Sequence, residues 1–152
     1  MKIELLLKVF LLSMTPVGEC RVSIPYGIYN GLSPTESFIV SFIGNTLMGI
    51  IIYYTIDLIR RYIFSKDPLN KYYKKFVKNK LKRLKLYSLG IVFSLAVFIA
   101  IPLPGTGAFT GAILARVLGL NLKEAIVSII SGVFTASLIV TILTLSSKAI
   151  LT

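Results

Sequence analysis

The sequence predicts an all-α integral membrane protein with two inverted repeats, each a re-entrant helical hairpin plus one transmembrane helix. Three observations favour this fold class, and they point to a single membrane domain over residues 1–152. The chain is 55% hydrophobic with a mean hydropathy of +0.83, which is high for a soluble domain. Its hydrophobic segments come in two lengths, and prolines and glycines bound the short ones. Its two halves also match each other at a constant offset in sequence.

The first hairpin is predicted near the N-terminus. Residues 3–15 form an apolar arm that is too short to cross a bilayer, and Pro16 and Gly18 break the helix after it. Residues 22–32 are the expected returning arm, which Pro25 should interrupt. Broken helices at membrane depth are tolerated only inside protein or beside a water-filled cavity, so we expect this bend to be enclosed.

Two segments, residues 34–59 and 123–150, are long enough to span a membrane, because about 20 residues cross the hydrocarbon core. Small residues along one side of each segment are expected to let neighbouring helices approach closely. Tyrosines near the ends of the predicted segments are expected in interfacial belts. These tyrosines are Tyr26, Tyr29, Tyr53, Tyr54, Tyr62 and Tyr87.

A basic connection, residues 61–86, joins repeat 1 (residues 1–60) to repeat 2 (residues 87–152). Eleven lysines and arginines in and beside it oppose one acid, Asp67, and so carry +10 of the net charge of +11. The positive-inside rule places this connection in the cytoplasm. Apolar residues at helical spacing predict an amphipathic helix that holds Lys71–Lys85 against the anionic inner leaflet. A solvated, charged linker is the alternative interpretation.

The second hairpin is predicted from two further short apolar arms, residues 86–101 and 108–120. The sequence between them is rich in residues that break helices. The predicted breaks are Pro102, Pro104, Gly105 and Gly107.

The internal match places equivalent structural features in register. An offset of 88 residues superposes Pro16 on Pro104, Gly31 on Gly119 and Glu36 on Glu124. Each half therefore has a broken short arm, a second arm that ends in glycine, and a capping box that starts the long helix. The capping boxes are Ser33-Pro34-Thr35-Glu36 and Asn121-Leu122-Lys123-Glu124. We accordingly predict structural roles for both capping glutamates.

Glu19, Arg21 and Arg116 are the candidate substrate- or ion-binding charges inside the membrane. An ionised side chain at mid-bilayer costs roughly 2.5–3.5 kcal/mol, so it usually has a partner or a function. Inverted repeats place the site near the midplane, where the two hairpins would meet. Arg116 would pair with Glu19 or bind an anion there, or alternatively extend to the interface. Asn45 is the polar candidate, with an interhelical hydrogen bond as its simpler role.

Other classes of function have little support in the composition. The chain has no histidine and one cysteine, Cys20, so the sequence offers no metal-ligand cluster, no disulfide and no nucleophile–base pair. We therefore expect no metal, no cofactor and no enzymatic activity. The basic run lies between hydrophobic segments, which argues against nucleic-acid binding.

The motif around the first bend resembles the signature P-x-x-E-x-R-x-x-I-P of the Putative small multidrug export protein family. The matching residues are Pro16-Val17-Gly18-Glu19-Cys20-Arg21-Val22-Ser23-Ile24-Pro25. The pair Gly44-Asn45 and the run Pro102-Leu103-Pro104-Gly105-Thr106-Gly107-Ala108 also match that family's pattern. This resemblance covers nearly the whole chain and implies export of small molecules across the cell membrane by a multi-pass protein.

The architecture is also similar to the wider DedA superfamily, whose members resemble proton-linked flippases of lipid carriers. In the DedA pattern an arginine follows shortly after the second proline-glycine break. Here Thr106 and Gly107 follow it, and the nearest arginine is Arg116. The flippase mechanism therefore does not transfer directly to this chain.

These features predict a secondary transporter in the plasma membrane, with a midplane site between the two hairpins. One carboxylate and two guanidinium groups would give a site of about +1, which favours an anion such as a lipid phosphate. A proton taken up by Glu19 would couple transport to a proton gradient. A flippase for lipid or lipid-carrier phosphate is one alternative, and a membrane scaffold that transports nothing is another. Membrane lipids are the expected partners, and a homodimer is compatible with the small helix faces.

Overall fold

The computed structural model describes residues 2–64, 88–103 and 105–151, and all regular secondary structure in these ranges is helical. The predicted all-α class is thus confirmed. The helices are α1 (Lys2–Ser13), α2 (Glu19–Tyr29), α3 (Pro34–Phe64), α5 (Ser88–Ala100), α6 (Ala108–Val117) and α7 (Leu122–Leu151). Their order in each half is short, short and long.

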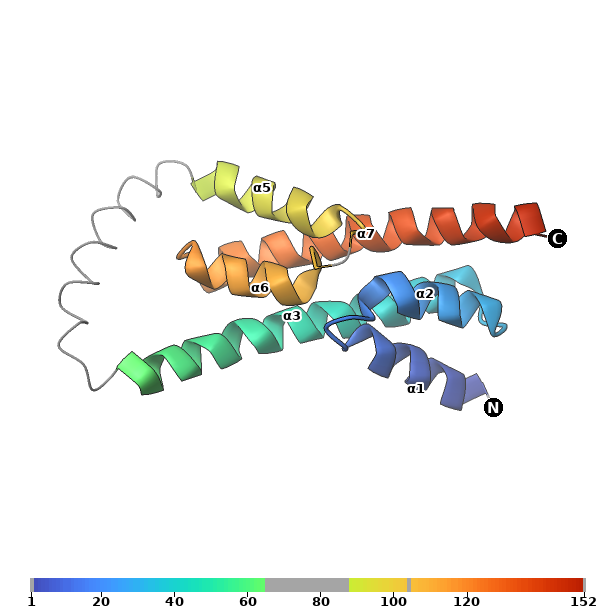
Figure 1. Cartoon of the computed structure of the whole chain (residues 1–152), viewed down its shortest axis with the longest axis horizontal. Helices are drawn as coiled ribbons and strands as arrows, with labels where there is room; N and C mark the ends of the chain where they lie inside the picture. The colour runs from blue at the N-terminus through green and yellow to red at the C-terminus, as the bar shows by residue number, and fades with distance from the viewer. Residues whose placement is uncertain (1, 65–87, 104, 152) are drawn as a thin grey trace.

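The two long helices, α3 and α7, lie side by side along the molecule, and the short helices pack on them in two pairs (Figure 1). The pair α1 and α2 lies toward the end where both termini are found. The pair α5 and α6 lies toward the opposite end. The bend of each pair points to the middle of the molecule, so that the two bends face each other (Figure 1).

The two long helices begin in the same way, as the capping boxes predicted. Before α3, the Ser33 hydroxyl accepts from the Glu36 N–H (3.2 Å), and the Glu36 carboxylate accepts from the Ser33 N–H (3.1 Å). Before α7, Asn121 and Glu124 make the equivalent pair of bonds, at 3.0 and 2.9 Å. These bonds satisfy N–H groups that a helix start leaves without an intrahelical partner, which supports structural roles for both glutamates.

The second short helix of each half also ends in the same way. Gly31 and Gly119 adopt positive φ angles of 100° and 74°, which glycine tolerates because it has no Cβ. The next residue then bonds back to the last turn, from Leu32 N–H to Gly27 and from Leu120 N–H to the Ala115 carbonyl. These are Schellman-type ends, and they turn the chain directly into the capping boxes.

One predicted break is wrong. Pro25 lies inside α2, which runs without interruption from Glu19 to Tyr29. Proline lacks an N–H, so the carbonyl of Arg21 four residues earlier loses its usual helical partner, but the neighbouring turns keep the helix together. The returning arm of the first hairpin is therefore a regular helix that begins three residues earlier than predicted.

Tyr53 also departs from its prediction. Its side chain is buried (4% exposed) and packs in a core that α3 shares with α5, α6 and α7, rather than in an interfacial belt. Its hydroxyl donates to the Leu120 carbonyl at 2.9 Å. A buried tyrosine needs such a partner, and the turn after α6 provides one.

Small residues occupy the close helix contacts, as the small-residue faces predicted. A Cβ added at Gly44 on α3 would overlap Ser13 of the first hairpin, and one at Gly132 on α7 would approach Ile99 of α5. Ser37 and Ser41 on the same side of α3 are fully buried. Close backbone approach is the usual basis of helix association where lipid gives no hydrophobic drive.

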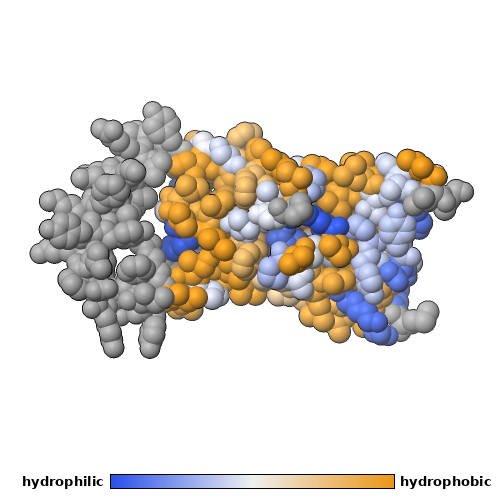
Figure 2. All heavy atoms as spheres, viewed as in Figure 1, coloured by the Kyte–Doolittle hydropathy of each residue, from blue (hydrophilic) through white to orange (hydrophobic). Residues whose placement is uncertain are grey.

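The outer surface is apolar over much of its area. Figure 2 shows hydrophobic residues over most of the described part of the viewed face, and hydrophilic residues gathered at the end that holds the termini. Large apolar side chains that are more than half exposed include Ile3, Leu7, Leu11, Val17, Leu58, Leu89, Phe93, Val117, Val127, Ile142 and Ile150. Such a surface is unfavourable in water and suits lipid.

Three predictions lie outside the described residues. They are the basic connection beyond Phe64, including the amphipathic helix with Lys71–Lys85, the interfacial position of Tyr87, and the break at Pro104.

Candidate functional site where the two bends meet

The bend between α1 and α2 is a tight turn that aims Glu19 at the second hairpin. Thr15 donates its hydroxyl to the Leu12 carbonyl (2.7 Å) and accepts from the Gly18 N–H (2.9 Å), which fixes the turn. A Cβ at Gly18 would overlap both of these residues, so the turn requires glycine there. Glu19 follows with a φ of 44°, a strained value for a residue other than glycine. Backbone strain of this kind is often found at functional sites.

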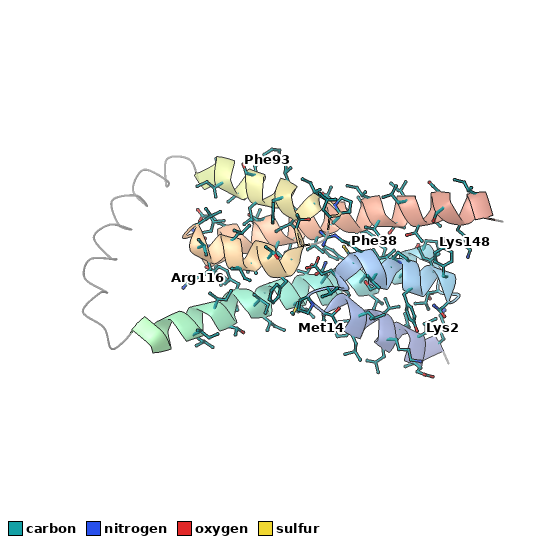
Figure 3. All side chains as sticks on the ribbon, in the orientation of Figure 1. Lys2, Met14, Phe38, Phe93, Arg116 and Lys148 are labelled. Atoms are coloured by element: carbon teal, nitrogen blue, oxygen red, sulfur yellow. The ribbon has the colours of Figure 1, made fainter. Side chains whose placement is uncertain are left out.

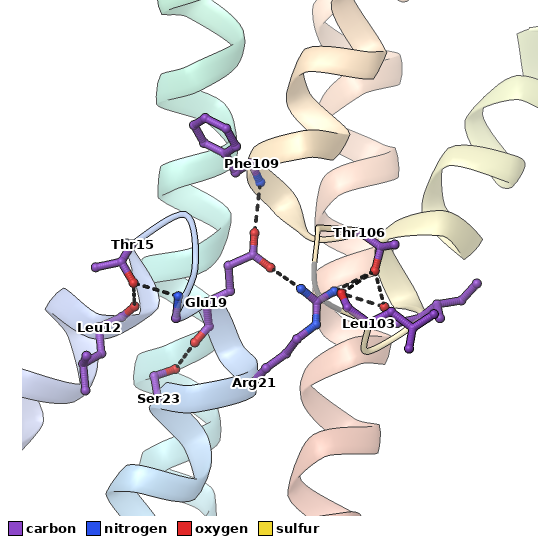
Figure 4. Close-up of polar contacts among 10 residues, drawn as sticks. Leu12, Thr15, Glu19, Arg21, Ser23, Leu103, Thr106 and Phe109 are labelled. Carbon is purple, nitrogen blue, oxygen red and sulfur yellow. Dashed lines mark hydrogen bonds and ion pairs between the residues drawn. The ribbon is translucent and has the colours of Figure 1, made fainter.

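The carboxylate of Glu19 bridges the two hairpins (Figure 4). One oxygen, Oε2, accepts from Nη1 of Arg21 at 2.8 Å, and the other, Oε1, accepts from the N–H of Phe109 at 3.3 Å. Gly107 is the N-cap residue of α6, and glycine has no side chain with which to cap a helix. Glu19 therefore caps α6 from the opposite hairpin and places its negative charge at the positive end of that helix.

Arg21 binds the loop between α5 and α6. Its Nη2 donates to the Ile101 carbonyl at 3.0 Å and to Oγ1 of Thr106 at 2.9 Å. The Thr106 hydroxyl also lies within hydrogen-bond distance of the Ile101 carbonyl (2.6 Å) and the Leu103 carbonyl (2.9 Å). A guanidinium group suits this role, since its planar fork holds several donors in fixed geometry. The first bend thus supplies the charges, and the second supplies backbone groups and one hydroxyl.

Gly107 allows the two bends to touch. A Cβ added there would overlap the Glu19 carboxylate, and the residue is buried. The predicted breaks Pro102 and Gly105 lie in the same loop, before the start of α6 at Ala108. Pro16 lies in the first bend with Gly18, so the breaks of both hairpins border one contact.

The ion pair is largely withdrawn from solvent, with side chains 2% exposed for Glu19 and 14% for Arg21. Burying two charges is expensive, and their attraction offsets the cost only when further hydrogen bonds satisfy them. The Phe109 N–H completes the carboxylate, while the loop carbonyl and Thr106 satisfy the guanidinium. Removal of either partner would leave an uncompensated buried charge, which is strongly destabilising.

Arg116 does not join this cluster, so its predicted pairing with Glu19 is wrong. It lies in the last turn of α6, away from the helix start that contacts Glu19 (Figure 3). Its Nη1 donates to the Tyr53 hydroxyl at 3.2 Å, and its guanidinium lies 5.2 Å from the centre of that ring. Because α6 points its start at the contact, two turns of helix separate Arg116 from it. The Glu19–Arg21 pair at the bends is therefore neutral overall, whereas the sequence predicted a site of about +1. The positive end of the α6 dipole lies beside this pair.

Asn45 lies beside the cluster rather than in it. Its side chain is buried (1% exposed) on α3, and it lies next to the thiol of Cys20, the residue after Glu19. Its Oδ1 has no hydrogen-bond partner among the described residues. The predicted interhelical bond is thus not made by this oxygen.

Sequence reasoning missed the groups of the second hairpin that bind the charges. Thr106 stands where the DedA pattern has an arginine, and its hydroxyl accepts a hydrogen bond from Arg21. The Phe109 N–H and the Ile101 carbonyl are backbone groups and carry no residue-type signal. The uncapped glycine at the start of α6 was the one available sign that a capping group had to come from elsewhere.

A groove of about 400 Å³ opens beside Arg21, on the side of α2 that faces α7. It is lined by Arg21, Pro25, Tyr29, Pro102, Val140, Leu143, Thr144 and Ser147. The hydroxyls of Tyr29 on α2 and Ser147 on α7 form a hydrogen bond of 3.0 Å that connects the two helices across the groove. The Nε of Arg21 is buried and has no partner among the described residues.

No cluster of three or more histidine, cysteine, aspartate or glutamate side chains capable of holding a metal ion occurs in the described part of the chain. The site consists of one ion pair, one hydroxyl and the backbone of two bends. These groups can bind and orient a polar ligand or carry a proton.

The helices and their apolar surface are those of a helical membrane protein. Two helices, Pro34–Ile56 and Leu122–Ile150, are long and apolar enough to cross a membrane. The profile of the family described as Putative small multi-drug export protein matches residues 19–139, and the chain belongs to this family. The match begins at Glu19 and includes every described contact between the bends. Searches of curated proteins and of solved structures found no match.

Proposed function

We propose that the protein is a secondary transporter that exports small molecules and whose substrate or coupling ion passes the contact between the two bends. Membership of the export family supports the general class. The observation that carries the site is the buried Glu19–Arg21 pair, which links two broken segments of opposite orientation. Discontinuous helices that bring their ends and charges to one point are how many transporters build their sites.

In this proposal the two halves are inverted repeats, and each short pair is a re-entrant hairpin. The short helices contain 10–13 residues, so each is about 15–20 Å long, well below the thickness of the hydrocarbon core. The long helices, with 31 and 30 residues, reach about 45 Å. The contact between bends near the middle of α3 and α7 then lies near the midplane of the membrane.

The proposed topology is multi-pass in the plasma membrane, with the basic connection in the cytoplasm and both termini outside. Lys2 and Lys148 lie at the same end of the molecule (Figure 3), as this arrangement requires. Fusion of a reporter to either terminus tests it, and reporters that signal from the cytoplasm at both termini would contradict it.

Glu19 is proposed as the proton carrier because it is the carboxylate at the contact between the bends. Replacement of Glu19 by Gln keeps the shape and removes the exchangeable charge. We expect transport by the variant, measured in vesicles with an imposed pH gradient, to lose its dependence on pH. Glu124→Gln is the matched control, since glutamine also completes a capping box. Unchanged pH dependence in the Glu19 variant would defeat the coupling proposal.

Translocation of a lipid or lipid-carrier phosphate is the second candidate, and the groove beside Arg21 favours it. The guanidinium would meet the phosphate, and the apolar lining from α7 would receive the chain. Vesicles offered a cationic dye or a labelled lipid phosphate distinguish the two substrates. Movement of neither would favour a scaffold that holds partners in the membrane.

A further inference from the structure

The face between α2 and α3 carries a ladder of small and polar side chains that ends at Glu19. These helices run in opposite directions and pair residues at nearly constant spacing. Gly27 faces Ser37, Ser23 faces Ser41, and Cys20 faces Asn45. We refer to these six residues as the polar lane. Its outer end lies where α3 begins, at the end of the molecule that holds both termini (Figure 1).

The two outer steps of the polar lane are direct contacts. A Cβ at Gly27 would overlap the Ser37 hydroxyl, so the glycine leaves this hydroxyl its space. Ser23 lies 2.8 Å from the Ser41 hydroxyl and 2.6 Å from the Glu19 carbonyl. The Cys20 thiol lies beside Asn45 and also beside Ser137 of α7. The lane thus leads, one helical turn at a time, to the residue that bridges the two bends.

Small side chains alone would indicate only close packing, but two buried oxygens on the lane lack partners. Ser37 is 0% exposed and Asn45 is 1% exposed. Oγ of Ser37 and Oδ1 of Asn45 have no hydrogen-bond partner among the described residues. An unsatisfied buried polar group costs about 1–3 kcal/mol, whereas alanine here would avoid that cost. These oxygens therefore point to a polar ligand that enters the lane.

We propose that the polar lane admits water and connects Glu19 with the membrane face on which both termini lie. Water is the ligand that fits, since hydroxyl and amide oxygens at one-turn spacing are bridged by molecules that make two to four bonds each. In its outer part, the lane carries no charged side chain that would hold an ion. Lys2 and Glu36 form an exposed ion pair (2.8 Å) beside its outer end. At the inner end, the charged partner of Glu19 is Arg21.

This inference extends the proposed function, because it supplies the route by which Glu19 would exchange protons. Since Ser37 and Asn45 are buried, hydration requires α2 and α3 to separate slightly. The facing side chains are glycine, serine and cysteine, so a small opening exposes polar groups that water can bridge.

The single cysteine of the chain is a reporter at the inner end of the lane. Thiols react as thiolates, which form only where water reaches them. We expect 2-aminoethyl methanethiosulfonate to modify Cys20 in the vesicle-reconstituted full chain, followed by intact mass. Ser37→Ala should slow this reaction about tenfold, because it removes an oxygen that holds water in the lane while breaking no protein hydrogen bond.

Ser128→Ala is the matched control, since Ser128 is equally buried but lies on α7 against α5. It should leave the Cys20 reaction rate unchanged. Thermal unfolding of each variant confirms that it is folded, and Ser41→Ala is the second variant if Ser37→Ala does not fold. A wild-type Cys20 that reacts only after unfolding overturns the proposal, as do equal rates in wild type and the folded lane variant.

The labelling experiment needs no substrate, so it can fail independently of the proposed function. If Cys20 reacts and Ser37→Ala slows its reaction, but no transport is found, the result supports the water-filled lane and contradicts the proposed transport. Proton-linked transport with an inert Cys20 would keep the transporter and reject the lane.

Discussion

The two bends occupy equivalent places in the two halves of the chain, yet they contribute different chemistry to their contact. The bend before α2 supplies a carboxylate and a guanidinium, Glu19 and Arg21. The bend before α6 supplies carbonyls, an N–H and the hydroxyl of Thr106. By contrast, the capping boxes and the glycine ends of the same two halves are nearly identical.

This difference separates what a repeat must keep from what it is free to change. A helix start or a helix end needs local groups in fixed geometry, so both halves use the same residue types there. A contact between halves needs complementary partners, so the two bends can differ in chemistry. The N–H of the second bend faces the carboxylate of the first, and its carbonyl and hydroxyl oxygens face the guanidinium, which buries both charges without leaving them unsatisfied.

The largest expected effect comes from breaking the charged bend. Arg21→Met removes the guanidinium and leaves the Glu19 carboxylate buried without its charged partner. We expect a loss of about 3–5 kcal/mol of stability, the range for breaking a buried ion pair. Thermal or denaturant unfolding in detergent measures it.

The double variant Glu19→Gln with Arg21→Met sharpens this test. It removes both charges, so we expect it to be more stable than Arg21→Met alone. If the two residues acted independently, Glu19→Gln would destabilise Arg21→Met by as much as it destabilises the wild type. That result would contradict the geometry.

A smaller effect is expected from the uncharged bend. Gly107→Ala introduces a Cβ where the Glu19 carboxylate lies, so one of the two must move. Overpacking of this kind typically costs about 1–3 kcal/mol, and here it should also weaken the capping of α6. The melting temperature in detergent is the measurement.

Gly90→Ala on α5 is the control for a glycine replaced by alanine, because a Cβ there has nothing within 4 Å. Alanine favours a helix over glycine, so this variant should be as stable as wild type or slightly more so. Equal melting temperatures for the two variants would mean that the bends do not touch at Gly107.

The smallest effects should come from the parts that the halves share. Ser33→Ala and Asn121→Ala each remove one capping side chain, and we expect a loss of about 1 kcal/mol from each. Similar shifts in melting temperature would support equivalent helix starts. A shift found in only one variant would show that the halves differ there despite the matching hydrogen bonds.

Much of the fold was accessible from the sequence because its signals are local. Proline and glycine between apolar runs located both bends, and Ser33 to Glu36 and Asn121 to Glu124 located the two long helices. Pro25 misled the prediction, since a proline can be accommodated within a helix when neighbouring turns hold it. Tyr53 misled it too, because a tyrosine near a predicted helix end can equally well be buried when a carbonyl lies within reach of its hydroxyl.

Residue types and their order along the chain determined the helices, their caps, the apolar surface and the candidates Glu19 and Arg21. Only the tertiary structure decided which groups meet. It paired Glu19 with Arg21 and the start of α6, left Arg116 with Tyr53, and made Thr106 an acceptor. The reason is that backbone N–H and carbonyl groups are the same in every residue, so their contribution depends on where the chain places them and not on its sequence letters.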